Sequence, residues 1–278
     1  MCEMFRIVHD VSIFCEMSTQ QHTETRPKIA ILTMVIGADY AKAMEPGLQT
    51  KREYAAKHGY DLHIGGKESW DRSRPIPWSK LRYILKYIDE YDYIFWSDAD
   101  VIITNPDFSI EKNIVPLLPP NKDLLWTKDV VGNLNSGNML LRGRSQWLKD
   151  FIERTYQQAQ FTYHIWWENA GMVHLYLTNP QDKEKIETIE NHSLFNAYLF
   201  GPKNISSDPT VRLFQPGDFL LHFAGVADQW NIYRMMRYIL HCLKTRTSYN
   251  TQLLDSWYVT PMKSKEDADM STQNILPN

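Results

Sequence analysis

Two carboxylates separated by one small residue, Asp98 and Asp100, follow directly on the apolar run of residues 93–96. Two negative charges this close are costly to bury unless a cation neutralises them. Hard divalent ions such as Mn²⁺ or Mg²⁺ prefer carboxylate oxygens and leave coordination positions open for phosphate oxygens. The ordinary alternative is a turn with two solvated aspartates, but the apolar residues on both sides of this DxD motif favour a metal site.

One histidine, His222, ends a second apolar run far along the chain. Residues 223–225, which include Gly225, allow a backbone to approach closely to whatever the imidazole holds. A lone histidine on an apolar strand is more often a core residue than a ligand. Combined with Asp98 and Asp100, however, it completes a carboxylate and imidazole set for one ion, with a diphosphate and water filling the remaining positions.

The composition excludes several classes of protein. The 278 residues carry 30 Lys+Arg and 33 Asp+Glu, a net charge of −3, so no basic field is available for nucleic acid. Three cysteines with no CxxC pair indicate neither a disulfide framework nor a zinc knuckle. No apolar run reaches the ~18–20 residues of a membrane span, and residues 1–27 lack the apolar centre of a signal peptide and are expected to form a disordered leader.

Alternating strands and helices must position these residues, and they indicate an α/β fold that begins with a right-handed parallel crossover. The third strand, over residues 91–103, brings the two aspartates to the sheet edge where ligands bind. Ser79 is expected to cap the helix before it, and disorder is expected after Ser264. Strands are predicted over residues 28–37, 60–64, 91–103, 123–130 and 136–143, and a last strand is predicted at the end of the segment 211–225. Helices are predicted over residues 46–58, 80–90, 146–158, 165–177 and 231–245.

Four ordered blocks together carry a family resemblance. They are IFWSDADVIITNP, LNSGNMLLRGRSQWLKDFI, WWENAGMVHL and GDFLLHFAGV, and they resemble glycosyltransferase family 34, the galactosyl, mannosyl and xylosyltransferases. The resemblance spans about residues 28–230. It implies a GT-A fold, with a Rossmann-like mixed central sheet and flanking helices, and retaining transfer from a UDP- or GDP-activated sugar to an oligosaccharide or glycoprotein acceptor.

The same resemblance implies a role for each matching residue. Asp98, Asp100 and His222 match the metal ligands of the family, with Asp98 also near the nucleotide ribose. Thr33, at the end of the first strand, falls where the family contacts the base and ribose.

Further matches concern the donor sugar. Residues Asn135, Ser136 and Gly137 match the block that lines the donor pocket, although this trio also suits a β-turn. Glu168 and Asn169 match a block beside the reacting sugar carbon, where many relatives have Gln and Ser after the acidic residue.

Plant relatives hold the diphosphate with a lysine soon after HFAG, and this chain has none there. Lys80 or Arg234 is considered as the substitute for this lysine, although most lysine and arginine side chains are simply exposed at the surface.

Transfer that retains the anomeric configuration requires either a double displacement or a front-face attack. We favour the front-face attack, with Glu168 stabilising the cationic sugar ring. The alternative for Glu168 is an exposed glutamate on a helix.

The acceptor glycan is expected to bind a tryptophan side chain, because sugar faces stack on aromatic rings. We favour Trp78 as this platform among Trp70, Trp78, Trp166 and Trp167, and core packing is the alternative for it.

The chain is therefore predicted to contain a catalytic domain over residues 28–245 and a partly disordered extension over 246–278. A metal phosphohydrolase would need further ligands near the DxD, which residues 102–105 do not supply. A catalytically inert carbohydrate-binding or scaffold subunit remains the alternative function. Homo- or hetero-oligomers are expected by analogy, as is a Golgi location, although the chain shows neither anchor nor signal and would otherwise be cytoplasmic.

Overall fold

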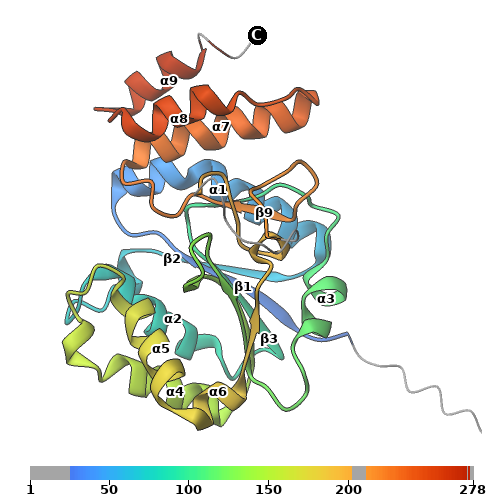
Figure 1. The fold of residues 1–278 in the computed structure, drawn as a ribbon, viewed down its shortest axis with the longest axis vertical. Helices are drawn as coiled ribbons and strands as arrows, with labels where there is room; N and C mark the ends of the chain where they lie inside the picture. Colours follow the sequence, from blue (N-terminus) through green and yellow to red (C-terminus); the bar gives the residue numbers. More distant parts are fainter. Residues whose placement is uncertain (1–25, 202–210, 274, 276–278) are drawn as a thin grey trace, which may run out of the picture.

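The computed structural model describes residues 26–201, 211–273 and 275. The predicted leader therefore lies, except for residues 26 and 27, outside the described residues. A mixed sheet crosses the centre of the molecule in the strand order β2-β1-β3-β6-β5-β7 (Figure 1). Its strands are β1 Ile29–Met34, β2 Asp61–Gly65, β3 Tyr93–Ser97, β5 Leu124–Lys128, β6 Leu134–Arg142 and β7 Ile186–Ile189.

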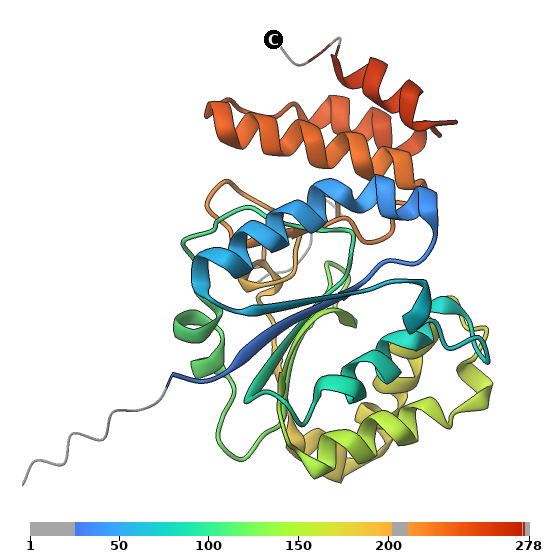
Figure 2. The same ribbon diagram turned by 180° about the vertical axis from the view of Figure 1, so that it is seen from behind.

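Helices cover both faces of this sheet. Helix α1 (Ala38–His58) lies on one face, whereas α2 (Ser79–Tyr87), α4 (Gln146–Tyr156) and α5 (Trp167–Thr178) lie on the other (Figures 1 and 2). Strand β1 is buried on both sides, with Ile31 facing the α1 layer and Leu32 the α2 layer, which confirms the predicted parallel strand. Short helices α3 (Ile110–Asn113) and α6 (Pro180–Lys185) complete this part of the fold.

The strand predicted over residues 91–103 is wrong as a single element. The chain leaves the central sheet after Ser97 and enters a second sheet as β4 (Val101–Ile103), which pairs with β9 (Leu220–His222) and through it with β8 (Ala197–Tyr198). Apolar residues on both sides of the DxD motif look alike in sequence, because both segments are buried strands. The antiparallel register pairs Val101 with His222 and thereby brings the histidine beside the aspartates.

Helix α1 begins at Ala38 rather than at the predicted Pro46, which lies inside the helix. Because proline is favoured in the first turn of a helix, Pro46 led to a predicted helix start that lies too far along the chain. A Cβ on the next residue, Gly47, would lie 2.7 Å from the Val101 carbonyl oxygen, so glycine is needed where α1 crosses β4. Gly59 ends the helix in the left-handed conformation, with a φ of 66°.

The predicted cap of α2 is also wrong in detail. Ser79 is the first residue of α2 and follows the 3₁₀ turn Ile76–Trp78, and its hydroxyl accepts from the backbone N–H of Asp71 at 3.0 Å. The turn continues directly into the helix, so the chain needs no separate capping side chain there. In α4, by contrast, the Ser145 hydroxyl caps the helix and accepts from the Leu148 N–H at 3.1 Å.

Three helices follow the second sheet: α7 (Gln229–Thr245), α8 (Thr251–Val259) and α9 (Lys265–Gln273) (Figures 1 and 2). The disorder predicted after Ser264 is wrong for residues 265–273, where Ala268 and Thr272 are buried. Polar residues dominate this helix because only one side of it packs. The predicted domain boundary at residue 245 stays a prediction. Within the described residues, no helix combines the length and apolarity that a bilayer crossing needs.

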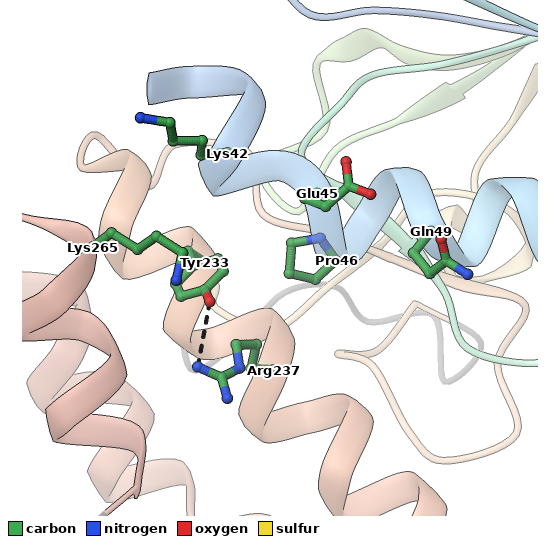
Figure 3. A pocket seen from close by; sticks show the side chains of 7 residues that line it. All are labelled: Lys42, Glu45, Pro46, Gln49, Tyr233, Arg237 and Lys265. Atoms are coloured by element: carbon green, nitrogen blue, oxygen red, sulfur yellow. Dashed lines mark hydrogen bonds between the residues drawn. The ribbon is translucent and has the colours of Figure 1, made fainter. Parts of the chain in front are cut away.

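A groove of about 390 Å³ is lined by residues of α1, α7 and α9 (Figure 3). Two of its cations, Arg237 and Lys265, both form ion pairs with Asp269. The single carboxylate therefore compensates part of their charge within the fold. Its lining consists of Lys42, Glu45, Pro46, Gln49, Tyr233, Arg237 and Lys265.

Lys51 gives the fold a pH dependence. Its ammonium is fully buried and donates to the Val101 carbonyl at 2.5 Å, and burial lowers its pKa from 10.5 to about 7 even though Asp100 and Asp98 oppose the change. The unfolded chain therefore holds a proton between pH 7 and 10.5 that the folded protein has released. Stability should rise with pH in this window by up to about 1.4 kcal/mol per unit.

We expect Lys51→Met to remove this slope, measured as the free energy of unfolding in urea at pH 7, 8 and 9. Lys57→Met, on the exposed side of the same helix, is the matched control and should follow the parent protein. Equal slopes in Lys51→Met and the parent would contradict the assignment.

Candidate active site

The two aspartates and the histidine converge where the chain passes between the two sheets. One ligand atom from each of Asp98, Asp100 and His222 lies within 4.8 Å of the others. Trp96 Nε1 donates to Asp98 Oδ1 at 2.7 Å, and His222 Nε2 lies 3.4 Å from Asp100 Oδ1. Two carboxylates and one imidazole suit Mn²⁺ and similar ions, and only three protein ligands leave positions for substrate oxygens.

A glycine of the NSG segment makes this convergence possible. The Asp98 N–H donates to the Gly137 carbonyl at 2.7 Å, so the turn after β3 rests on β6. A Cβ on Gly137 would lie only 2.2 Å from Cε1 of His222. The glycine is therefore required for the imidazole to reach the aspartates, a role that is independent of any ligand.

Lys80, on α2, joins this cluster to Glu168. Its ammonium lies 3.1 Å from Asp98 Oδ1 and 2.8 Å from Glu168 Oε1. Ser136 contributes two acceptors, its carbonyl at 3.1 Å and its hydroxyl at 3.3 Å. The lysine that sequence comparison offers as a diphosphate ligand thus holds two carboxylates together inside the protein.

The charges of this cluster determine its protonation. Burial lowers the pKa of Lys80, but the carboxylates of Asp98 and Glu168 outweigh burial and the net pKa is raised, so the lysine stays charged. Burial raises the pKa of Glu168, only partly opposed by Lys80. For Asp100 burial acts in the same direction, but His222 and Lys51 outweigh it and the pKa is lowered.

The start of α5 is tied to β6 by side chains that sequence comparison assigns to the donor pocket. Asn169 accepts from the Ser136 N–H at 2.9 Å and donates to the Leu134 carbonyl at 3.1 Å. Ser136 Oγ donates to Glu168 at 3.2 Å. Trp167, just before these residues, has a φ of 43°, a strained value for a bulky side chain. The strain orients Glu168 inward and leaves the tryptophan ring exposed.

Three further residues lie on segments near the cluster, and two of them, Thr33 and Gly225, were predicted as site residues. Thr33 is completely buried in β1, and among the described residues its hydroxyl has no hydrogen-bond partner. Gly225 has a φ of 82°, which favours glycine in the turn after His222, and its carbonyl accepts from Tyr258 at 3.1 Å. Tyr40 was not predicted; burial and the charges of Asp100 and Asp98 raise its pKa, so it lies within their field.

The structure does not support the roles suggested for Trp78 and Arg234. Trp78 is completely buried and its Nε1 donates to the Thr162 carbonyl at 3.1 Å, so it is a core residue and not an acceptor platform. Arg234 is buried on α7, with Nη2 directed to the carbonyls of Trp257 and Thr260 at 3.3 and 3.2 Å. Trp166 and Trp167 are instead exposed, at 47% and 42%.

Several known proteins similar to this chain are glycosyltransferases. The model of the galactosyl transferase GMA12/MNN10 family matches residues 25–120, which include the DxD motif. The chain is similar to this family over these residues. An uncharacterized α-1,2-galactosyltransferase of Schizosaccharomyces pombe is 24% identical over 255 residues, or 76% of this chain and 64% of that protein. Another α-1,2-galactosyltransferase of the same yeast is 21% identical over 82% of this chain and 65% of its own length.

The chain spans less than two thirds of the length of these relatives. Among solved structures, a glycosyltransferase involved in the glycosylation of the major capsid of PBCV-1 has a TM-score of 0.59. It is 14% identical, and the match covers 76% of this chain and 99% of that one. The likeness concerns the fold, which is the predicted GT-A fold with its mixed central sheet.

Removing the Lys80 ammonium should destabilise the protein. Lys80→Met leaves the buried Glu168 carboxylate and Asp98 without their cation, and we expect a loss of about 3–5 kcal/mol in the free energy of unfolding. The double variant Lys80→Met/Glu168→Gln should recover part of this loss, because one of the two charges is also removed. Urea unfolding at neutral pH measures both, and an unchanged stability of Lys80→Met would contradict the ion-pair assignment.

Proposed function

We propose that this protein is a metal-dependent retaining glycosyltransferase that moves a sugar from a nucleotide-sugar donor to a glycan acceptor. The observation that carries the proposal is the convergence of Asp98, Asp100 and His222 beside the buried pair of Lys80 and Glu168. A divalent ion held by the first three would compensate the negative charge that develops on the leaving diphosphate. The similarity to the galactosyl transferase family and the GT-A fold support this assignment.

The remaining predicted residues would surround the donor. Thr33 borders the nucleotide, and Asn135, Ser136 and Gly137 border the sugar. Lys80 would act less as a direct diphosphate ligand than as the cation that keeps Asp98 and Glu168 in place. The buried Thr33 hydroxyl is available for a ligand, since no described residue bonds to it.

Glu168 fits an electrostatic role better than a nucleophilic one. Its Oε1 is engaged by Lys80 and Ser136, which lowers its reactivity toward the anomeric carbon. Its Oε2 is buried and bonds to none of the described residues, an arrangement that is costly without a partner. A developing positive charge on the sugar ring would supply that partner. We therefore favour front-face attack, in which the departing phosphate accepts the acceptor's proton.

The names of the relatives favour galactose as the donor sugar, and UDP-galactose is our first candidate, ahead of GDP-mannose and UDP-xylose. Manganese is the proposed ion, with magnesium as the substitute. The Golgi location and the oligomers expected from the resemblance stay predictions.

The metal site can be tested by ligand-induced stabilisation. Bound nucleotide sugar raises the melting temperature by mass action, and we expect UDP-galactose to do so only with Mn²⁺. Asp100→Asn should abolish this shift, whereas Asp89→Asn, an exposed aspartate paired with Lys149, should preserve it. Metal-independent binding that survives in Asp100→Asn would overturn the proposal. Release of free galactose without an acceptor separates a transferase from an inert scaffold subunit, which should release none.

Exposed aromatic and aliphatic side chains beside Glu168 offer a surface for the glycan acceptor. Tyr163, Ile165, Trp166 and Trp167 are all exposed, an unusual density of apolar groups on an exposed face. Flat rings of this kind stack on sugar faces. The peptide bond from Trp167 to Glu168 places this surface next to the proposed reaction centre.

For Trp166→Ala we expect the KM for the acceptor to rise by about threefold to tenfold, the usual size of an aromatic contact, with an unchanged KM for the donor. Leu177→Ala, exposed at the far end of the same helix, is the matched control. A higher donor KM without any change toward the acceptor would contradict this location. Initial rates with each substrate varied in turn give both constants.

A further inference from the structure

Asn196, a residue with no place in the sequence motifs, lies completely buried behind the metal cluster. Its Oδ1 is 2.9 Å from His222 Nδ1, and its Nδ2 is 3.2 Å from Asn135 Oδ1. The same Nδ2 donates to the Tyr198 hydroxyl at 2.6 Å, and Oδ1 also accepts from Asn138 Nδ2 at 2.9 Å. One amide therefore touches both the histidine of the metal cluster and the asparagine of the donor block.

The direction of these hydrogen bonds is set by the backbone. The Gly137 N–H, which can only donate, points to Asn135 Oδ1 at 2.9 Å and so fixes that atom as an acceptor. The Asn196 atom facing it must then be the donating nitrogen. It follows that the oxygen of Asn196 faces His222, and that Nδ1 of the neutral ring carries the proton.

When its ring is neutral, His222 held in this tautomer presents the lone pair of Nε2 toward Asp100, 3.4 Å away. A lone pair and a carboxylate repel each other unless a cation lies between them. The bond from Nδ1 also holds the orientation of the ring, as hydrogen bonds to the second nitrogen do for metal-binding histidines generally. The protein thus prepares the imidazole as a ligand before any ion arrives.

We propose that Asn196 is a positioning residue that couples the metal and donor halves of the site. It fixes the tautomer of His222 through Oδ1 and the orientation of Asn135 through Nδ2, so one buried amide serves both. This inference rests on the proposed function for its ligands, but the hydrogen-bond polarity stands on the geometry alone.

The tautomer can be measured directly in the metal-free protein. Long-range ¹H–¹⁵N correlation spectra of the ¹⁵N-labelled wild-type chain, recorded at a pH where the ring of His222 is neutral, should show a protonated Nδ1 and an unprotonated Nε2. The assignment of the resonance comes from its loss in His222→Gln. A ring protonated on Nε2 would overturn the proposal without requiring any variant of Asn196 to fold.

Two substitutions of Asn196 separate its effect on metal binding from its effect on donor binding. Asn196→Leu removes both contacts and should weaken Mn²⁺ binding by about 10- to 100-fold, measured by calorimetry. Asn196→Asp keeps an acceptor for His222 but places an oxygen against Asn135. We expect its Mn²⁺ affinity to stay within about threefold, while the affinity for UDP-galactose at saturating Mn²⁺ falls by about tenfold.

Tyr198→Phe is the matched control, since it removes the hydroxyl that accepts from the same amide but keeps the ring that packs beside His222. Both affinities should stay within about threefold of wild type. If Tyr198→Phe weakened metal binding as much as Asn196→Leu, general loss of packing would be the cause and the proposal would fail. A wild-type ring with the expected tautomer, in a protein that binds no nucleotide sugar with Mn²⁺, would overturn the transferase function and leave the positioning role intact.

Discussion

The structure depends on how it compensates negative charge at the point where the chain changes sheets. Asp98 and Asp100 lie there, and Glu168 approaches from α5. Lys80 neutralises part of this charge from within the core. Carboxylates brought together in a poorly hydrated place are stable only with such partners. A divalent ion on the remaining oxygens would complete the same balance.

The geometry of that point follows from strand pairing and from two glycines. The antiparallel register of β4 and β9 sets His222 opposite Val101, directly after the aspartates. Gly137 leaves the space that the imidazole occupies, and Gly47 lets α1 rest against β4. Because each contact is too close for a Cβ, these positions constrain the sequence for packing reasons before any substrate is considered. Gly137, which packing requires, is therefore also the residue that lets the proposed metal ligand His222 reach the aspartates.

Some errors in the predicted elements have a common physical origin. The break after Ser97 and the helical start at Ala38 depend on which surface a segment meets, and the local pattern of apolar residues is the same in either case. Helix α9 is polar because only one side packs, so its composition resembles that of a disordered tail. Strand β8 has only two residues, too few for any periodicity, and Asn196, just before it, was missed for that reason.

By itself the sequence determined the fold class and the acidic pair at the tip of β3, because a buried strand that ends in two carboxylates is a pattern of adjacent residues. The four motif blocks also indicated which residues would gather around the donor. Tertiary structure decided which of these contacts exist: that Lys80 bridges Asp98 and Glu168, that Trp78 is core, and that Asn196 sets the polarity of His222. Such contacts join residues far apart in the chain, and their directions depend on distances and burial that no local pattern encodes.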